Sequence, residues 1–282
     1  MFDFASLTFA DIAPFIAIGF AAQLIDGALG MAFGVISQTL LVSIGVPPAA
    51  ASASVHLVEV FTTGASGASH IVHRNVDWGL FRRLVPFGVA GGVLGAYLLS
   101  NIDASAARPF VMAYLAAVGG YLLFKAIRMA RPRFEDPQTT RPLALVGGFL
   151  DAAGGGGWGP VVTSNLLVQG ADPRKTVGTV NAAEFVLALS VSLAFLASLG
   201  IEAFTIATVG LIVGGVAAAP FGALLAKRLR PRLLLGTVAV VLMATTTEYS
   251  AAYTVNSTAS AEVMTVAHTG VRQRGWMRRT SR

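Results

Sequence analysis

Long apolar runs, separated by short polar or glycine-rich stretches, are the main pattern of this chain. Residues 12–72 contain no Lys or Arg, and Arg74 is the first basic residue. Within this region, two apolar pieces flank the stretch 26–30, and the second piece stops at Pro47. Each piece is shorter than the roughly 20 residues that a helix needs to cross a bilayer. The pattern therefore predicts two half-length helices joined by a glycine-rich break, as a broken or re-entrant hairpin.

Three longer apolar runs follow this hairpin, and the same order then repeats. The first set covers 51–72, 84–100 and 109–127. A second glycine-rich break lies at 151–159, and further runs cover 176–199, 203–226 and 233–243. We expect five regions: an N-terminal segment (1–11), a first transmembrane repeat (12–128), a basic linker (129–142), a second transmembrane repeat (143–244) and an irregular C-terminal tail (245–282).

The two halves are related by an internal repeat. One constant shift places Asp26 on Asp151 and Glu59 on Glu184 without a gap. Roughly a quarter of the positions from 26 to 59 are identical, several times the level of chance. The matches include glycines and prolines, at Gly30 with Gly155, Gly34 with Gly159, and Pro48 with Pro173.

Basic residues set the expected orientation, because cytoplasmic loops are rich in Lys and Arg. With the 129–142 linker in the cytoplasm, the basic loops at 74–83, 174–175 and 227–232 also lie inside. One hairpin plus three spans reverses the second half. We therefore expect an all-α, polytopic integral membrane protein with two inverted repeats, each a broken or re-entrant helical hairpin plus about three transmembrane helices.

Composition excludes several other classes. Charged residues make up 12% of the chain, against about 25% in soluble globular proteins. The net charge of +6 does not indicate nucleic-acid binding, because the basic residues cluster between apolar runs. The chain has no cysteine, which excludes disulfides and cysteine nucleophiles. We expect a multi-pass protein of the cell inner membrane whose partners are the lipid bilayer and a small anionic substrate; homo-oligomerisation stays open.

Four acidic residues lie within apolar elements: Asp26, Glu59, Asp151 and Glu184. An ionised side chain in a bilayer is costly, so such residues face a cavity or a partner. As two repeat-related pairs, they predict a polar centre where the halves meet, with a role in coupling or gating and protons as the coupling ion. For Asp26 and Asp151, the favoured interpretation is simpler: each accepts hydrogen bonds from free backbone N–H groups at a glycine-rich break.

His56 lies three residues before Glu59, on the same helical face, and Asn181 stands at that place before Glu184. The pair is interpreted as hydrogen-bonded or as proton-responsive. The sequence offers no further His or Glu beside it, so neither a metal site nor a cofactor is expected. An intramembrane enzyme is disfavoured for a similar reason, since no Ser or Asp stands near His56 in the pattern of a known hydrolase.

The glycine-rich breaks predict an anion site. A helix that starts after each break would present N–H groups and its positive dipole end at mid-membrane depth. The expected substrate-binding residues are Gly30, Gly34, Ser37 and Gln38 in the first half, and Gly155, Gly159, Thr163, Ser164 and Asn165 in the second. No Lys or Arg lies in these elements, so neutral donors would hold the anion. Alternatively, these polar side chains form hydrogen bonds between helices. The glycines at 88–95 and 210–214, spaced by four, predict helix packing.

Residues 22–34 and their echo at 148–160 resemble the TauE/SafE family of sulfite exporters and related permeases, as does the stretch 170–179. The resemblance runs from about residue 12 to 235 and does not extend into the tail. It implies a permease, not an enzyme, that moves sulfite or an organosulfonate by alternating access and is driven by ion gradients. A passive anion channel, an intramembrane enzyme and a membrane scaffold remain the alternatives.

Overall fold

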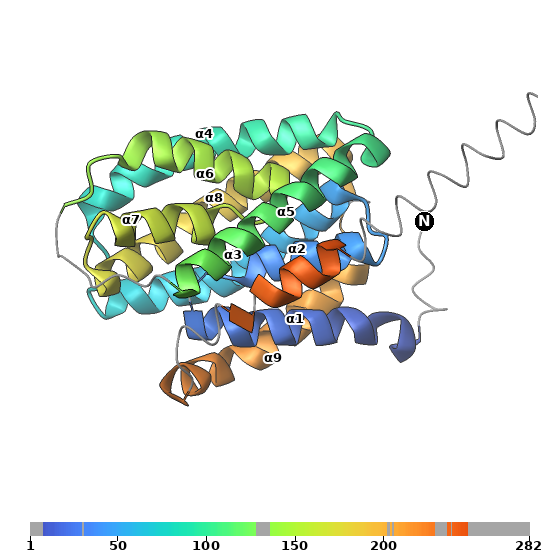
Figure 1. Ribbon diagram of the computed structural model, residues 1–282, viewed down its shortest axis with the longest axis horizontal. Coiled ribbons are helices and arrows are strands. Elements are labelled where there is room, and N and C mark those ends of the chain that lie inside the picture. The colour runs from blue at the N-terminus through green and yellow to red at the C-terminus, as the bar shows by residue number, and fades with distance from the viewer. Residues whose placement is uncertain are drawn as a thin grey trace, which may run out of the picture.

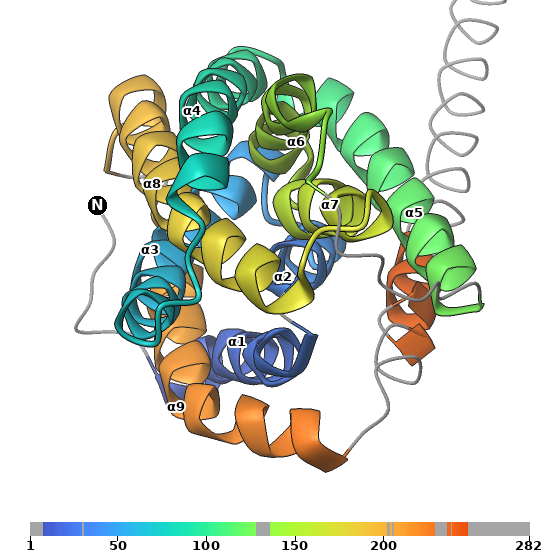
Figure 2. The ribbon, with the colours of Figure 1, turned by 90° about the vertical axis from the view of Figure 1, so that its left-hand side faces the viewer.

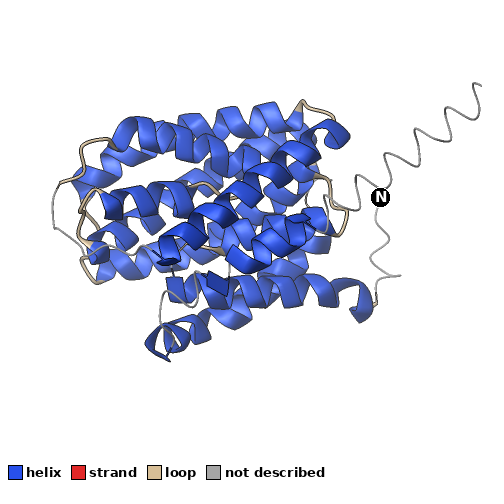
Figure 3. Cartoon of the chain, viewed as in Figure 1, coloured by secondary structure: helices blue, strands red, loops and turns tan. Residues whose placement is uncertain are grey.

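The computed structural model describes residues 8–29, 31–127, 136–201, 204, 206–228, 236–237 and 239–247. This part of the chain is built from helices and loops, with no strand (Figure 3). In chain order, the helices are α1 (Phe9–Leu29), α2 (Phe33–Ser43), α3 (Pro48–Val72), α4 (Trp78–Ser100), α5 (Ala104–Ile127), α6 (Thr140–Gly154), the π-helical segment η2 (Trp158–Thr163), α7 (Ser164–Val168), α8 (Pro173–Leu199) and α9 (Ile206–Arg228). The described residues from 236 to 247 are also helical.

Local sequence signals account for the ends of these helices. Pro48 and Pro173 open α3 and α8, at positions where the missing N–H would have no partner in the helix. The Asp172 carboxylate accepts hydrogen bonds from two N–H groups at the start of α8, and Asp77 does the same for α4. Helix α6 ends at Gly155, whose φ of +81° suits glycine best.

The repeats are inverted, as predicted. Helices α3 and α8 occupy equivalent places in the two halves and pack side by side. The His56 ring lies 6.3 Å from the Phe195 ring, whereas Gly67, further along α3, packs against Ala182. Residue numbers therefore fall along α8 as they rise along α3, so the equivalent helices run antiparallel.

The hairpin helix of each half also packs against a long helix of the other half. Helix α1 packs against α9, and its repeat equivalent α6 packs against α4 (Figure 2). Glycines allow these close approaches: a Cβ at Gly91 would lie 2.0 Å from the backbone oxygen of Leu145, and one at Gly214 would lie 2.0 Å from that of Ile16. The prediction that the glycines spaced by four are packing contacts is confirmed.

The first hairpin differs from the sequence expectation. Helix α1 has 21 residues and is apolar enough to cross a membrane, whereas a half-length helix was predicted. It starts earlier than expected, at Phe9, and continues through Asp26 to Leu29. The hydrogen bonds of Asp26 are compatible with a helical backbone, so the interruption is confined to the residues between α1 and α2. In the second half, the 15-residue α6 and the short α7 match the predicted broken hairpin.

Four described segments are long and apolar enough to span a membrane: Phe9–Asp26, Trp78–Ser100, Ala104–Lys125 and Pro173–Leu199. Helix α3 has 25 residues but is more polar, because it carries His56, Glu59 and several hydroxyl groups. Most of these polar groups are buried inside the bundle and do not face lipid. Viewed end-on, the bundle holds α2 and α7 near its middle, with longer helices around them (Figures 1 and 2). The all-α polytopic fold is confirmed.

Candidate functional site

The two aspartates at the breaks make matching hydrogen bonds. Asp26 Oδ1 accepts from the backbone N–H groups of Ala32 (2.6 Å) and Phe33 (3.1 Å). Asp151 Oδ1 accepts from those of Gly157 (2.7 Å) and Trp158 (3.0 Å). The favoured interpretation of both aspartates is thus confirmed. The N–H groups expected to bind an anion already have carboxylate partners, so an incoming anion needs additional donors.

A small cavity lies where the two breaks meet. All four predicted acids line it: Asp26 and Glu59 from the first half, Asp151 and Glu184 from the second. The other lining residues are apolar or carry hydroxyl groups, and no basic side chain is among them. Its volume of ≈ 20 Å³ has room for about one water molecule. The predicted polar centre between the halves therefore exists, and the space within it is small.

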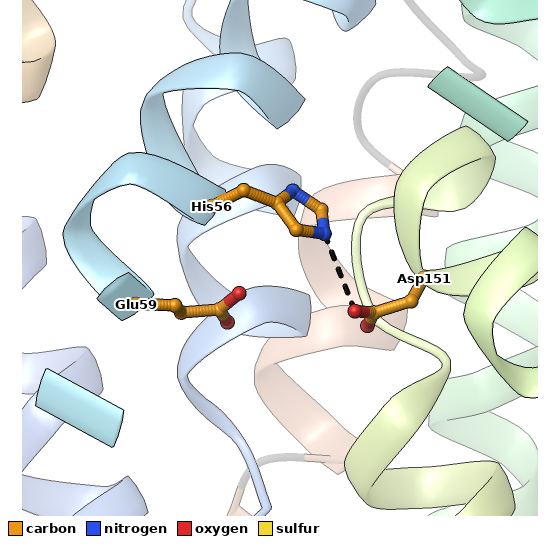
Figure 4. A group of neighbouring side chains, drawn as sticks. All are labelled: His56, Glu59 and Asp151. Atoms are coloured by element: carbon orange, nitrogen blue, oxygen red, sulfur yellow. Dashed lines mark hydrogen bonds and ion pairs between the residues drawn. The ribbon is translucent and has the colours of Figure 1, made fainter. Parts of the chain in front are cut away.

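Like Glu184 and unlike the aspartates, Glu59 accepts no hydrogen bond from a described residue, and it is the more deeply buried of the two glutamates. Its side chain belongs to α3 and is only 4% exposed. Within the described part of the chain, its carboxylate has no hydrogen-bond partner. The backbone of Gly34 passes so close that a Cβ there would lie 3.1 Å from Glu59 Oε1. Glu59 is thus a buried carboxylate directed into a cavity (Figure 4).

His56 joins the two halves beside this cavity, through its contact with Asp151. Its Nε2 atom lies 3.2 Å from Asp151 Oδ2, and both side chains are buried (Figure 4). On the other side of the ring, Nδ1 lies 2.8 Å from the backbone oxygen of Ser52. A carbonyl oxygen only accepts, so Nδ1 carries a hydrogen. In a neutral imidazole with its hydrogen on Nδ1, Nε2 has only a lone pair, which cannot donate to the Asp151 carboxylate. The contact is a hydrogen bond only if a proton lies between Nε2 and Oδ2.

This arrangement corrects one argument made from the sequence. A Ser and an Asp do lie beside His56, since Ser52 Oγ is 3.3 Å from Nδ1 and Asp151 faces Nε2. The geometry still differs from a hydrolase triad. The Ser52 hydroxyl donates to the backbone oxygen of Ala152 at 2.7 Å, and Nδ1 already carries a hydrogen. His56 therefore cannot take a proton from Ser52 through that atom.

The reason for expecting no metal site is also weakened. One side-chain atom from each of His56, Glu59 and Asp151 lies within 4.8 Å of the others. The sequence showed only the first two together, and the fold adds the third. A shared proton accounts for the contact between His56 and Asp151, and the expectation of no metal stays a prediction.

The sequence matches a protein-family model described as "Sulfite exporter TauE/SafE" over residues 15–249. The chain belongs to the TauE/SafE family. It is similar to a protein of Bacillus subtilis (strain 168) described as "Probable membrane transporter protein YtnM", with 46% identity over 225 residues, covering 77% of this chain and 75% of that protein. No solved structure matches. The resemblance seen in the breaks is confirmed, and the chain is a multi-pass membrane transporter.

The residues predicted to bind substrate in this TauE/SafE protein are only partly gathered at the cavity. Gly34 and Gly159 line it, whereas Gly155 ends α6 and would clash with Gln38 if it carried a Cβ. Gly30 lies outside the described residues. The side chains of Ser37, Gln38, Thr163, Ser164 and Asn165 are absent from the cavity lining.

Two of these side chains are already engaged with backbone oxygens. Gln38 Nε2 donates to the Pro48 oxygen at 3.1 Å, and Asn165 donates to that of Val161 at 2.7 Å. Asn181, the counterpart of His56, donates to the Val177 oxygen of its own helix at 2.9 Å. His56 makes the equivalent contact with the Ser52 oxygen, and it also contacts the Asp151 carboxylate of the other half.

Sequence reasoning missed three participants at the TauE/SafE site. Thr62 and Thr63 line the cavity one turn after Glu59, a spacing that could have revealed them. Tyr114 of α5 donates from its hydroxyl to the Gly156 oxygen at 3.0 Å, which braces the second break. No local signal relates Tyr114 to that break, because the contact depends on how α5 packs.

Proposed function

We propose that the chain carries a small oxyanion, sulfite or an organosulfonate, across the membrane together with protons, by alternating access at the central cavity. The observation that carries this proposal is the lining of the cavity: four carboxylates, two from each half, with no basic side chain. The substrate class is supported by the description of the family, a sulfite exporter.

Charge explains why protons accompany the anion. An anion admitted beside ionised carboxylates is repelled, and no cation of the cavity lining offsets that repulsion. Protonation of Glu59 and Glu184 removes it and turns the carboxyl groups into hydrogen-bond donors. Occupancy by the anion and by protons is then coupled, and each increases the affinity for the other. The direction of net flow follows the sum of the two gradients.

Alternating access is supported by the arrangement of open spaces. A cavity of ≈ 510 Å³ lies between the starts of α4 and α8, and one of ≈ 350 Å³ lies between their ends. The central cavity lies between α2, α3 and the second break and is too small for sulfite as it stands. Access from either end therefore requires the inverted halves to move, as in other transporters built from inverted repeats.

Flux in proteoliposomes tests this function. Sulfite, sulfate, thiosulfate and a sulfonate are offered with and without an imposed proton gradient. The proposal predicts saturable accumulation of sulfite or the sulfonate that collapses when the gradient is removed. Flux that only equilibrates would replace it with a passive channel, and chemical conversion of the substrate would replace it with an enzyme.

Alternating access is tested separately by thiol labelling, because the chain has no cysteine and so gives no background. Thr63→Cys places one thiol at the cavity wall. Membrane-impermeant reagents should reach it from either face, with substrate raising reactivity from one face while lowering it from the other. Reactivity that rises from both faces together would indicate a continuous pore.

A further inference from the structure

Lys125 is a cation close to the candidate site and is not one of the predicted site residues. It lies in the last turn of α5, within the span Ala104–Lys125, and is half-buried. Its Nζ atom donates a hydrogen bond of 2.6 Å to Ser164 Oγ on α7. No carboxylate of a described residue forms an ion pair with it. A partly buried ammonium facing only a neutral hydroxyl leaves its charge uncompensated.

The Ser164 hydroxyl beside Lys125 otherwise contacts only neutral groups of the described residues, Met31 and Tyr121. Ser164 Oγ accepts from Lys125, and its own hydrogen points to Met31 Sδ at 3.8 Å, a weak acceptor. The next residue along the chain, Thr163, is fully buried, and its Oγ1 has no hydrogen-bond partner in the part of the chain that the structure describes. Among the described residues, the groups in contact with Ser164 are thus an ammonium, a phenol and a thioether, and none is a charged acceptor. An oxyanion supplies that acceptor and opposite charge together.

This corner adjoins the central cavity. Met31 contacts Ser164 on one side and lines the cavity on the other. A methionine side chain is flexible, so Met31 can act as a movable partition between them. The repeat does not reproduce the arrangement: Thr39, the counterpart of Ser164, donates to the Val35 oxygen of its own helix at 2.7 Å. The cation therefore marks one side of the cavity, the side on which α5 leads into the basic linker.

We propose that Lys125 and Ser164 form a second binding position for the substrate oxyanion, which the anion occupies before it passes Met31 into the acidic cavity. This inference rests on the proposed function, since it assigns the entry position of the same substrate. Lys125 attracts the anion from the linker face, and proton uptake by the acids then admits it to the cavity. Selectivity against cations arises at this first position, which the acid-lined cavity alone does not provide.

The test compares Lys125→Met with Lys125→Arg in oriented proteoliposomes, with sulfonate transport measured separately from each face. Loss of the ammonium should raise the KM from the linker face roughly 10- to 100-fold, the range for a hydrogen bond to a charged group. The KM from the opposite face should change little, and Lys125→Arg should recover most of the loss. Arg82→Met is the control, because it removes an exposed cation near the start of α4 that lines neither the central cavity nor the ≈ 510 Å³ cavity; its KM should equal that of the wild type.

Ser164→Ala is a second variant, which keeps the cation and can be measured even if Lys125→Met does not fold. It should raise the KM from the linker face by a smaller factor. A KM unchanged from both faces in folded Lys125→Met and Ser164→Ala, with transport intact in the wild type, overturns this inference and leaves the proposed function standing. An equal rise from both faces also overturns it, since the position would then not be one-sided. A wild-type protein that moves no anion overturns the proposed function and this inference with it.

Discussion

Replacing Glu59 with Gln isolates the charge that we hold responsible for proton coupling. Gln has nearly the shape of a protonated Glu and does not ionise. The Glu59 side chain is buried against the cavity and has no hydrogen-bond partner within the described part of the chain. The substitution therefore strands no other group, and its effect on anion binding reports the charge itself.

The magnitude follows from the size of the cluster. The facing atoms of His56, Glu59 and Asp151 lie within 4.8 Å of one another. An anion admitted between the hairpins therefore lies on the order of 5 Å from Glu59, where two like charges repel by about 3 kcal/mol at an effective dielectric constant of about 20. This repulsion corresponds to a factor on the order of 100 in Kd.

In the proposed mechanism, the wild-type protein avoids that repulsion by taking up a proton with the anion. Its Kd should therefore rise with pH, by up to about tenfold per pH unit for each proton taken up. In Glu59→Gln, the slope should fall by one proton, so the Kd should rise less steeply with pH than in the wild type. Uptake driven by a pH gradient should weaken with it.

The assay is calorimetric titration of purified protein from mildly acidic to mildly alkaline pH. A sulfonate is the ligand, because it keeps its single charge over this range, whereas sulfite itself takes up a proton. Asp103→Asn is the control. Hydrogen bonds from the Ser105 hydroxyl and backbone N–H lower the pKa of the exposed Asp103 carboxyl, so its charge does not change over this range. The reasoning is refuted if Glu59→Gln keeps the wild-type slope, or if the wild type has no slope.

Three further predictions concern packing and the hydrogen bonds of His56 and Asp151. Gly91→Ala should lower the free energy of unfolding by about 1–3 kcal/mol, because the new Cβ would clash with the Leu145 backbone oxygen. Gly120→Ala is the control: no atom lies within 4 Å of its new Cβ, so thermal unfolding should show an unchanged or higher stability. His56→Asn should fold normally, since Asn181 makes the equivalent contact, and its thermal unfolding should lie closer to that of the wild type than the unfolding of His56→Ala does. Asp151→Ala, which frees two buried N–H groups, should lower stability by about 2 kcal/mol or more, whereas Asp151→Asn should recover part of the loss.

The fold was largely predictable, because the lengths of the apolar runs and the internal repeat are visible in the sequence itself. Apolar runs long enough for a bilayer give the helices, and the match of Asp26 with Asp151 gives the repeat. The length of α1 was not predictable in this way. Asp26 and the glycine after it were interpreted as an interruption, yet the Asp26 carboxylate reaches forward to the N–H groups of Ala32 and Phe33 without breaking its own helix.

The acids of the site were predictable, and their partners were not. An ionisable residue in an apolar run is conspicuous, so Glu59 and Glu184 could be recognised from the sequence. The contact of His56 with Asp151 joins residues far apart in the chain and depends on how α3 packs against α6. Lys125 shows the same limit: nothing near it in the sequence indicates that it reaches Ser164 on another helix.

Simultaneous measurement of proton and sulfonate movement tests the central claim most directly. Vesicles contain the protein and a pH-sensitive dye, the membrane potential is clamped, and no pH gradient is imposed. We predict that adding the sulfonate outside acidifies the interior as the sulfonate enters, and that Glu59→Gln diminishes the acidification relative to the flux. Sulfonate entry with no proton movement in the wild type would contradict the account.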